Sequence, residues 1–201
     1  MKNLVRWVVC WLSLAAIVSA RADIELFPLA ADTEVPPLGS KQGYGIIRLH
    51  LSGVAPSLEV RGLIGGNATP PREIGQRKYR NPEKLLLGGL SDGLYVLPLR
   101  AGGFQVTSVN VPSFSLPFRL DVSENPRWFF RIEQGKASYI GDLAIAPERR
   151  TDTVNIQLRN RLATDLELLN DAVTLLPGSP PFVSGYSLRD NFLMQLEEAK
   201  Q

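Results

Sequence analysis

The stretch that decides the fold is DGLYVLPLRAGGFQV, residues 92–106. Two apolar runs, 94–99 and 104–106, flank the short reversal 100–103, which ends in a glycine pair. Glycine adopts positive φ at little steric cost, so a glycine pair between two apolar runs predicts a β-hairpin. We therefore expect a mainly β domain with this hairpin near its centre.

Alternating runs continue the pattern after the hairpin. Side chains two apart on a strand share a face, and every second residue is apolar in 114–122, 128–132 and 139–145. The expected strands of this central region are 93–99, 103–111, 114–122, 127–133 and 137–146. Together they predict an antiparallel β-sandwich.

The phase of these runs predicts a core. We expect Phe118, Leu120, Trp128 and Phe130 to be buried, because each occupies an apolar position of its run. Phe129 is out of phase and should point to the opposite face of its strand. There it is either covered by a helix or exposed for a partner.

Regions on both sides of the centre add strands and one long loop. Alternation predicts further strands at 23–28, 43–51, 57–62 and 153–159. The segment 65–83 is rich in Gly, Pro and basic residues, and a loop of this length inside a compact domain is usually functional or disordered.

The first 22 residues have the pattern of a cleaved secretory signal peptide. A basic start precedes an apolar run from Trp7 to Val18, and Ala20-Arg21-Ala22 is a small-x-small cleavage site. Cys10 is not part of a lipobox. We therefore expect a periplasmic or secreted protein that begins at Asp23, with no cysteine and no disulfide framework.

Removing the signal changes the charge balance. The segment holds three of the 22 basic residues and none of the 20 acidic ones, so the remaining chain carries a net charge of about −1. The basic balance of the whole chain therefore belongs to the export signal. It does not indicate nucleic acid as a partner.

The C-terminal part changes to helical spacing. Thr164-Asp165-Leu166-Glu167 reads as a capping box, and apolar residues recur at steps of three and four up to Leu176. A second helix start is expected at Ser187. The predicted organisation is a signal peptide (1–22), a sandwich (23–160) and an extension of two short helices packed on the sandwich (161–201).

We expect at least one of these helices to dock on the outer face of a sheet, because helices this short need packing to be stable. Phe129 and Ile140 are the residues expected to receive it. The alternative is that the final helix is a free arm for a partner.

The sequence offers no catalytic constellation. His50 is the only histidine and alternates onto the face of its strand expected to be in solvent, and the carboxylates of Asp92, Asp121, Glu133 and Asp142 fall on turns or exposed positions. We expect no catalytic, cofactor-binding or metal-binding residues, and therefore no enzyme, since metal sites and serine-type triads usually need an imidazole.

One basic segment is the best candidate for a partner surface. It contains four positive charges and an aromatic ring, as a contact to an anionic partner or to membrane headgroups would. With the out-of-phase aromatic added, the candidate partner surface consists of Arg72, Arg77, Lys78, Tyr79, Arg80 and Phe129.

Two stretches resemble a known type of domain. YVLPLRAGGFQVTSV (95–109) is similar to a hairpin of carboxypeptidase-regulatory-like and transthyretin-like domains, and FFRIEQGKASYIGDLAI (129–145) resembles the following segment in secreted bacterial proteins of that type. The resemblance implies a prealbumin-like sandwich in an accessory or envelope protein and no catalytic residues. An immunoglobulin-like sandwich is the alternative fold.

These observations give one functional expectation and two alternatives. We expect a non-catalytic exported protein that supports or binds another cell-envelope protein or polymer, with no cofactor and with peripheral membrane contact as a variant. The first alternative is a carbohydrate- or small-ligand-binding module, which would show aromatic side chains on an exposed sheet face. The second is an exported hydrolase.

Overall fold

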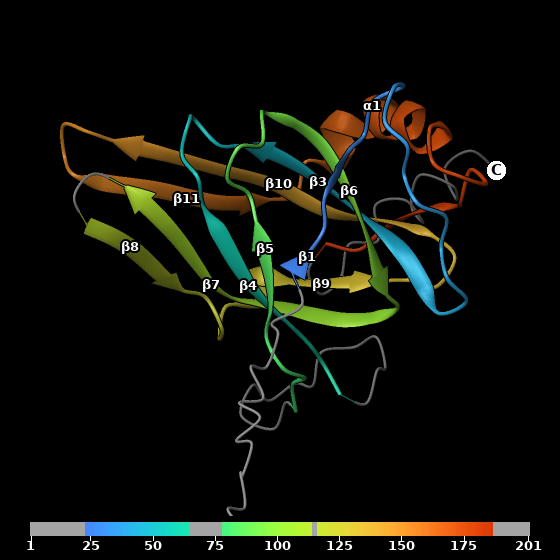
Figure 1. Ribbon diagram of the computed structural model, residues 1–201, viewed down its shortest axis with the longest axis horizontal. Helices are drawn as coiled ribbons and strands as arrows, with labels where there is room; N and C mark the ends of the chain where they lie inside the picture. The colour runs from blue at the N-terminus through green and yellow to red at the C-terminus, as the bar shows by residue number, and fades with distance from the viewer. Residues whose placement is uncertain (1–22, 65–77, 114–115, 187–201) are drawn as a thin grey trace, which may run out of the picture.

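The computed structural model describes residues 23–64, 78–113 and 116–186 (Figure 1). In this part of the chain, two six-stranded sheets and one α-helix account for most of the regular structure. The expected signal peptide, residues 65–77 of the long loop and the expected second helix from Ser187 onward lie outside the described residues.

Sheet A has the strand order β1-β5-β4-β7-β8, and β9 pairs with β7 beyond the end of β8. Its strands are β1 (Asp23–Ile24), β4 (Ser57–Gly62), β5 (Glu83–Leu86), β7 (Gly102–Ser113), β8 (Leu116–Asp121) and β9 (Phe129–Ile132). Sheet A is antiparallel except for β1, which runs parallel to β5.

Sheet B has the strand order β11-β10-β3-β6-β2, and β12 pairs with β10. Its strands are β2 (Phe27–Pro28), β3 (Gln42–His50), β6 (Gly93–Arg100), β10 (Ala137–Glu148), β11 (Thr153–Arg159) and β12 (Phe182–Ser184). β10 runs parallel to both β3 and β12, so the expectation of a purely antiparallel fold is wrong. Apolar alternation is the same for parallel and antiparallel strands, and the pattern could not separate them.

The stretch 92–106 does not form a β-hairpin. β6 pairs with β2 and β3 in sheet B, whereas β7 pairs with β4, β8 and β9 in sheet A. Gly102, with a φ of 148°, turns the chain from one sheet to the other. The reversal was predicted correctly, but it crosses between the layers and does not join two neighbouring strands.

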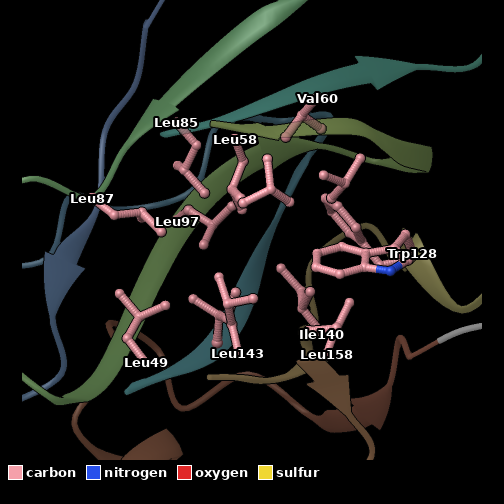
Figure 2. Packing of buried hydrophobic residues seen from close by; sticks show 14 of the residues in the cluster. Leu49, Leu58, Val60, Leu85, Leu87, Leu97, Trp128, Ile140, Leu143 and Leu158 are labelled. Carbon is pink, nitrogen blue, oxygen red and sulfur yellow. The ribbon is translucent and has the colours of Figure 1, made fainter. Parts of the chain in front are cut away.

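The main core lies between the inner faces of the two sheets (Figure 2). Figure 2 shows Leu49 and Leu97 of sheet B and Leu58 of sheet A pointing into this space, together with Trp128. Burial of apolar surface of this kind is the dominant favourable term in folding. The architecture is therefore mainly β and sandwich-like, with the predicted burial of Trp128 confirmed.

The other three predicted core positions differ in their burial. Phe130 is buried and its ring stacks on that of Phe104, with ring centroids 5.3 Å apart. Leu120 is only partly buried, and Phe118 is 37% exposed, so the prediction for Phe118 is wrong. Phe118 does share a face with Val111, but it lies on the edge strand β8, where neighbours cover one side only.

A β-bulge in β10 changes the phase of that strand. The pairing with β3 shifts between Tyr139 and Gly141, and Gly141 has a φ of 143°. Ile140 and Leu143 therefore both belong to the main core, whereas Tyr139 lies on the outer face. The predicted common face of Tyr139 and Leu143 is wrong, and Ile140 does not receive a helix.

Helix α1 (Leu162–Thr174) packs on the outer face of sheet B, which confirms that a helix docks there. Figure 1 shows α1 outside the two sheets. A second apolar cluster joins helix and sheet, with Tyr44, Ile46, Val96, Tyr139, Leu162, Leu169 and Val173 among its buried members. Sheet B is therefore covered on both faces in this region, whereas sequence alternation suggested a solvent face.

The start of α1 also differs from the prediction. Thr164 lies inside the helix, and the Oδ1 atom of Asn160 accepts a hydrogen bond from the N–H of Leu162 at 3.0 Å. The expected capping box is therefore wrong, because the chain enters the helix earlier, directly after β11. The extension is also not purely helical, because β12 returns the chain to sheet B.

Candidate functional site

The predicted partner surface is described only in part. Arg72 and Arg77 lie outside the described residues. Lys78, Tyr79 and Arg80 follow the end of β4: the Arg80 N–H donates to the Gly62 carbonyl at 2.8 Å, and Tyr79 pairs with Leu63. Lys78 is exposed, while Tyr79 and Arg80 are half-buried. The structure thus brings these three residues to one end of sheet A.

Phe129 is not available as an exposed contact. It is 2% exposed, and a Cβ atom on Gly103 would lie 2.9 Å from the Phe129 ring and 3.6 Å from the Leu63 side chain. The ring therefore lies against the backbone of β7. Phe129 does point to the face opposite Phe130, as alternation predicted, but its membership of a partner surface is corrected because the ring is buried.

An ionic cluster links the outer face of sheet B to helix α1. Arg48 on β3 donates from Nη1 to Oδ2 of Asp165 on α1 at 2.9 Å, and Arg161 Nε lies 3.7 Å from the same oxygen. Asp142 on β10, directly opposite Arg48 in the register, lies with Oδ2 4.0 Å from Arg48 Nε. Charged groups this far from water are stable only when they are paired.

His50 belongs to the same cluster. Its Nε2 atom lies 3.1 Å from Oδ2 of Asp142, and its Nδ1 atom lies 3.7 Å from Oδ2 of Asp92. Both ring nitrogens therefore face carboxylates, and Asp142 is 2% exposed, so the expected exposed position of this carboxylate is wrong. A general base needs one ring nitrogen directed at the group that it deprotonates. His50 thus links β3 to Asp142 on β10 and to Asp92, which precedes β6.

Tyr139 lies beneath this cluster. Its hydroxyl oxygen accepts a hydrogen bond from the N–H of Arg161 at 3.2 Å. Burial raises the pKa of Tyr139 well above its usual range, and the nearby carboxylates of Asp142 and Asp165 raise this pKa further. The hydroxyl therefore stays protonated, and it positions the first residue before the helix.

Two adjoining depressions form a groove that begins on the outer surface of sheet A and continues past the β3–β4 turn to the end of β10 and the turn that follows it. One depression of about 420 Å³ spans β5, β4, β7 and β8, and a second of about 790 Å³ lies beside it. They adjoin, since both are lined by Ala55 and Pro112. The other lining residues of the first depression include Pro56, Ser57, Lys84, Leu86, Gly88, Asn110 and Pro117, and those of the second include Ser52, Gly53, Val54, Ala146, Pro147 and Arg149.

Strand register explains the shape of this groove. Leu86, Ser57 and Asn110 lie side by side on β5, β4 and β7, and the short Ser57 side chain sits between longer neighbours. Pro112 and Pro117 face each other across β7 and β8. The result is a shallow floor of small and apolar groups, with Leu86 48% exposed.

The charges of the groove have one sign. Lys84 and Arg149 line it, and its described lining residues include no carboxylate and no aromatic side chain. Within the described ranges, no ion pair involves either cation. The groove can therefore contact an extended apolar segment and attract negative charge, but it offers no set of acid and base groups.

Other kinds of site have less support in the described ranges. The space between the sheets holds a cavity of about 20 Å³ lined by apolar side chains, which has room for nothing larger than a water molecule. Residues 23–64, 78–113 and 116–186 contain no group of three or more His, Cys, Asp or Glu side chains that could hold a metal ion. The same residues form no helix long and apolar enough to cross a membrane.

Sequence reasoning missed both the groove and the ionic cluster. The groove brings together residues from five distant segments, and the exposed positions of Leu86 and of the two prolines gave only a weak local signal. The cluster joins Arg48 to Asp165, which are 117 residues apart. Comparisons of the chain with protein-family models, with curated proteins and with solved structures gave no significant match.

Proposed function

We propose that the chain is a non-catalytic, exported binding domain that supports another cell-envelope protein or polymer through the groove on sheet A. The observation that carries the proposal is the asymmetry of the two sheets. The outer face of sheet B is covered by α1, whereas the outer face of sheet A has a groove that contains the exposed Leu86 and Lys84 and continues to Arg149 after β10; neither cation has an ion-pair partner among the described residues. Exposed apolar surface beside charge of one sign is typical of an interaction site.

The partner that fits this surface is an extended, negatively charged polypeptide or polymer. Leu86 and the facing prolines provide apolar contact area, and acidic groups are attracted by Lys84 in one depression and by Arg149 in the other. Two surface cations steer association and set its salt dependence more than they set affinity. Binding should therefore weaken as the salt concentration rises.

Two features support a binding role over an enzymatic one. The only histidine has both ring nitrogens directed at carboxylates, and the groove contains no His, Asp or Glu among its described lining residues. The carbohydrate-binding alternative is less favoured, since the described lining residues provide no aromatic platform. A prealbumin-like class within the sandwich fold remains part of the proposal, on the resemblance of residues 95–109 and 129–145.

The test begins with recovery of the partner. The protein, isolated from its native envelope after mild cross-linking, should carry one dominant component, which is then purified and added back. Amide hydrogen exchange should slow in β5 and in the 52–57 turn when the partner is bound. Slowing confined to α1 or to other surfaces, with none at the groove, would refute the proposal.

A further inference from the structure

Strand β11 is a sheet edge that lacks the short length, the proline and the bulge by which other edge strands block strand addition. Two of the other edges, β1 and β2, are only two residues long, and the edge strand β8 contains Pro117, which has no N–H to donate. β11 pairs with β10 over seven residues without a register shift and contains no proline. Short edge strands, prolines and bulges are the usual protection against edge pairing.

The side of the molecule that carries β11 is also incompletely buried. Only residues 25–26 separate β1 from β2, so these two edges close one side, and β8 and β11 lie at the opposite side (Figure 1). There, Leu120, Val154 and Ile156 are only partly buried against the main core, and Phe118 is 37% exposed. An apolar seam thus accompanies a backbone edge that pairs with β10 alone among the described strands.

We propose that β11 pairs antiparallel with β11 of a second copy of this chain, about a two-fold axis through Ile156. A two-fold interface must be self-complementary, because each copy presents the same surface. In this register, Ile156 faces Ile156 and Val154 faces Leu158 on the inner face. On the outer face, Asn155 faces Gln157 and Thr153 faces Arg159, so no like charges are opposed.

The charges and the strand period select this register. Asp152, which is exposed at the start of β11, opposes Asn160 of the second copy and lies next to its Arg159. Moving the axis to residue 155 would place Asp152 against Leu158. An axis between two residues would oppose apolar to polar side chains along the whole strand, since the side-chain period is two. A strand of another protein would not be expected to match β11 at each of these positions. β11 of a second copy does match it.

Engineered cysteines test the register directly. In a Cys10→Ser background, Asn155→Cys and Gln157→Cys are prepared as separate variants, so that the thiols come only from the substitutions. Directly opposed residues lie about 4.5–5.5 Å apart between Cα atoms, within disulfide range, whereas identical residues are diagonal neighbours about 7–8 Å apart. Oxidation of the mixture should give a disulfide-linked dimer, and each variant alone should give at least tenfold less.

Charge substitution at the same exposed positions provides a second readout. The double variant Asn155→Lys, Gln157→Lys opposes lysines across the axis and should weaken dimerisation at least tenfold in sedimentation equilibrium. The variant Asn155→Glu, Gln157→Glu should do the same alone, and mixing the two should restore a 1:1 dimer. A wild-type chain that stays monomeric at all concentrations, or equal cross-linking of each cysteine variant alone, would overturn the proposal. So would a monomeric chain that instead captures a foreign strand along β11.

Discussion

Nη1 of Arg48 lies 2.9 Å from Oδ2 of Asp165, and this contact ties β3 of sheet B to helix α1. Asp165 is buried and also faces Arg161, while Arg48 reaches toward Asp142 on β10. A buried ion pair gains little over an apolar pair, but removing one partner leaves the other charge uncompensated. The cluster therefore fixes where the helix lies on the sheet.

Asp165→Asn should lower the free energy of unfolding by about 1–3 kcal/mol, because Arg48 loses its charged partner while part of its side chain can still reach water. The matched control is Asp171→Asn, which removes an exposed carboxylate from the same helix and should change the free energy by less than about 0.5 kcal/mol. Urea unfolding gives both values. Equal effects of the two substitutions would contradict a structural role of the cluster.

We expect the effect of Tyr139→Phe on the free energy of unfolding to depend on pH. Near neutral pH the variant should be less stable by about 1 kcal/mol, because the N–H of Arg161 loses its acceptor. Burial raises the pKa of Tyr139 in the folded protein, so above pH about 10 the unfolded chain loses this proton while the folded chain keeps it. Wild-type stability then falls with pH, and the phenylalanine variant lacks this loss.

The difference in the free energy of unfolding between wild type and Tyr139→Phe should therefore become smaller from pH 8 to pH 11. Chemical unfolding across this range measures the difference directly, because the other titrating groups are common to both proteins. A gap that stays constant would show that the tyrosine pKa is the same in the folded and the unfolded chain.

Gly141→Ala tests the bulge in β10. A Cβ at this position would lie 2.9 Å from Leu158 Cδ1 and 3.1 Å from the carbonyl oxygen of Arg159, and its φ of 143° is unfavourable for alanine. We expect Gly141→Ala to lower the free energy of unfolding by about 2–4 kcal/mol. Gly89→Ala is the control, since it also has positive φ but no atom within 4 Å of its Cβ position, and it should lose about 1–2 kcal/mol. A larger loss at Gly89 would argue against the crowding at Gly141.

The two phenylalanines that alternation placed in one core should respond differently to truncation. Phe130→Ala removes a buried ring that stacks on Phe104, and we expect a cost of about 3–5 kcal/mol. Phe118→Ala removes a ring that already contacts solvent, so about 1 kcal/mol is expected. If thermal unfolding showed similar losses of stability for the two variants, Phe118 would have to be buried in the core.

The sequence pattern correctly predicted several features that depend on neighbouring residues alone. The strand at Ser57–Gly62, the strand that contains Thr153–Arg159 and the burial of Trp128 follow from apolar alternation, and a docked helix follows from helical spacing. The errors in topology are non-local. Alternation does not reveal that β6 and β7 belong to different sheets, nor that β3 runs parallel to β10.

A single inserted residue explains another group of errors. The β-bulge between Tyr139 and Gly141 breaks the alternation of β10, so Ile140 and Leu143 both point inward although they are three residues apart, and Tyr139 points outward. It also accompanies the burial of Asp142 beside Arg48 and His50. The groove was not predictable either, because its lining residues meet only when the two sheets are assembled.

The measurement that tests the central claim most directly is the affinity of the purified partner for three forms of the chain. The double variant Lys84→Glu, Leu86→Asp changes the groove, and Leu168→Asp changes a leucine of similar exposure on α1. Calorimetric titration should show affinity reduced at least tenfold for the groove variant and unchanged for the α1 variant, with a loss of affinity in high salt for the wild type. Equal affinity of all three forms would contradict binding through the groove.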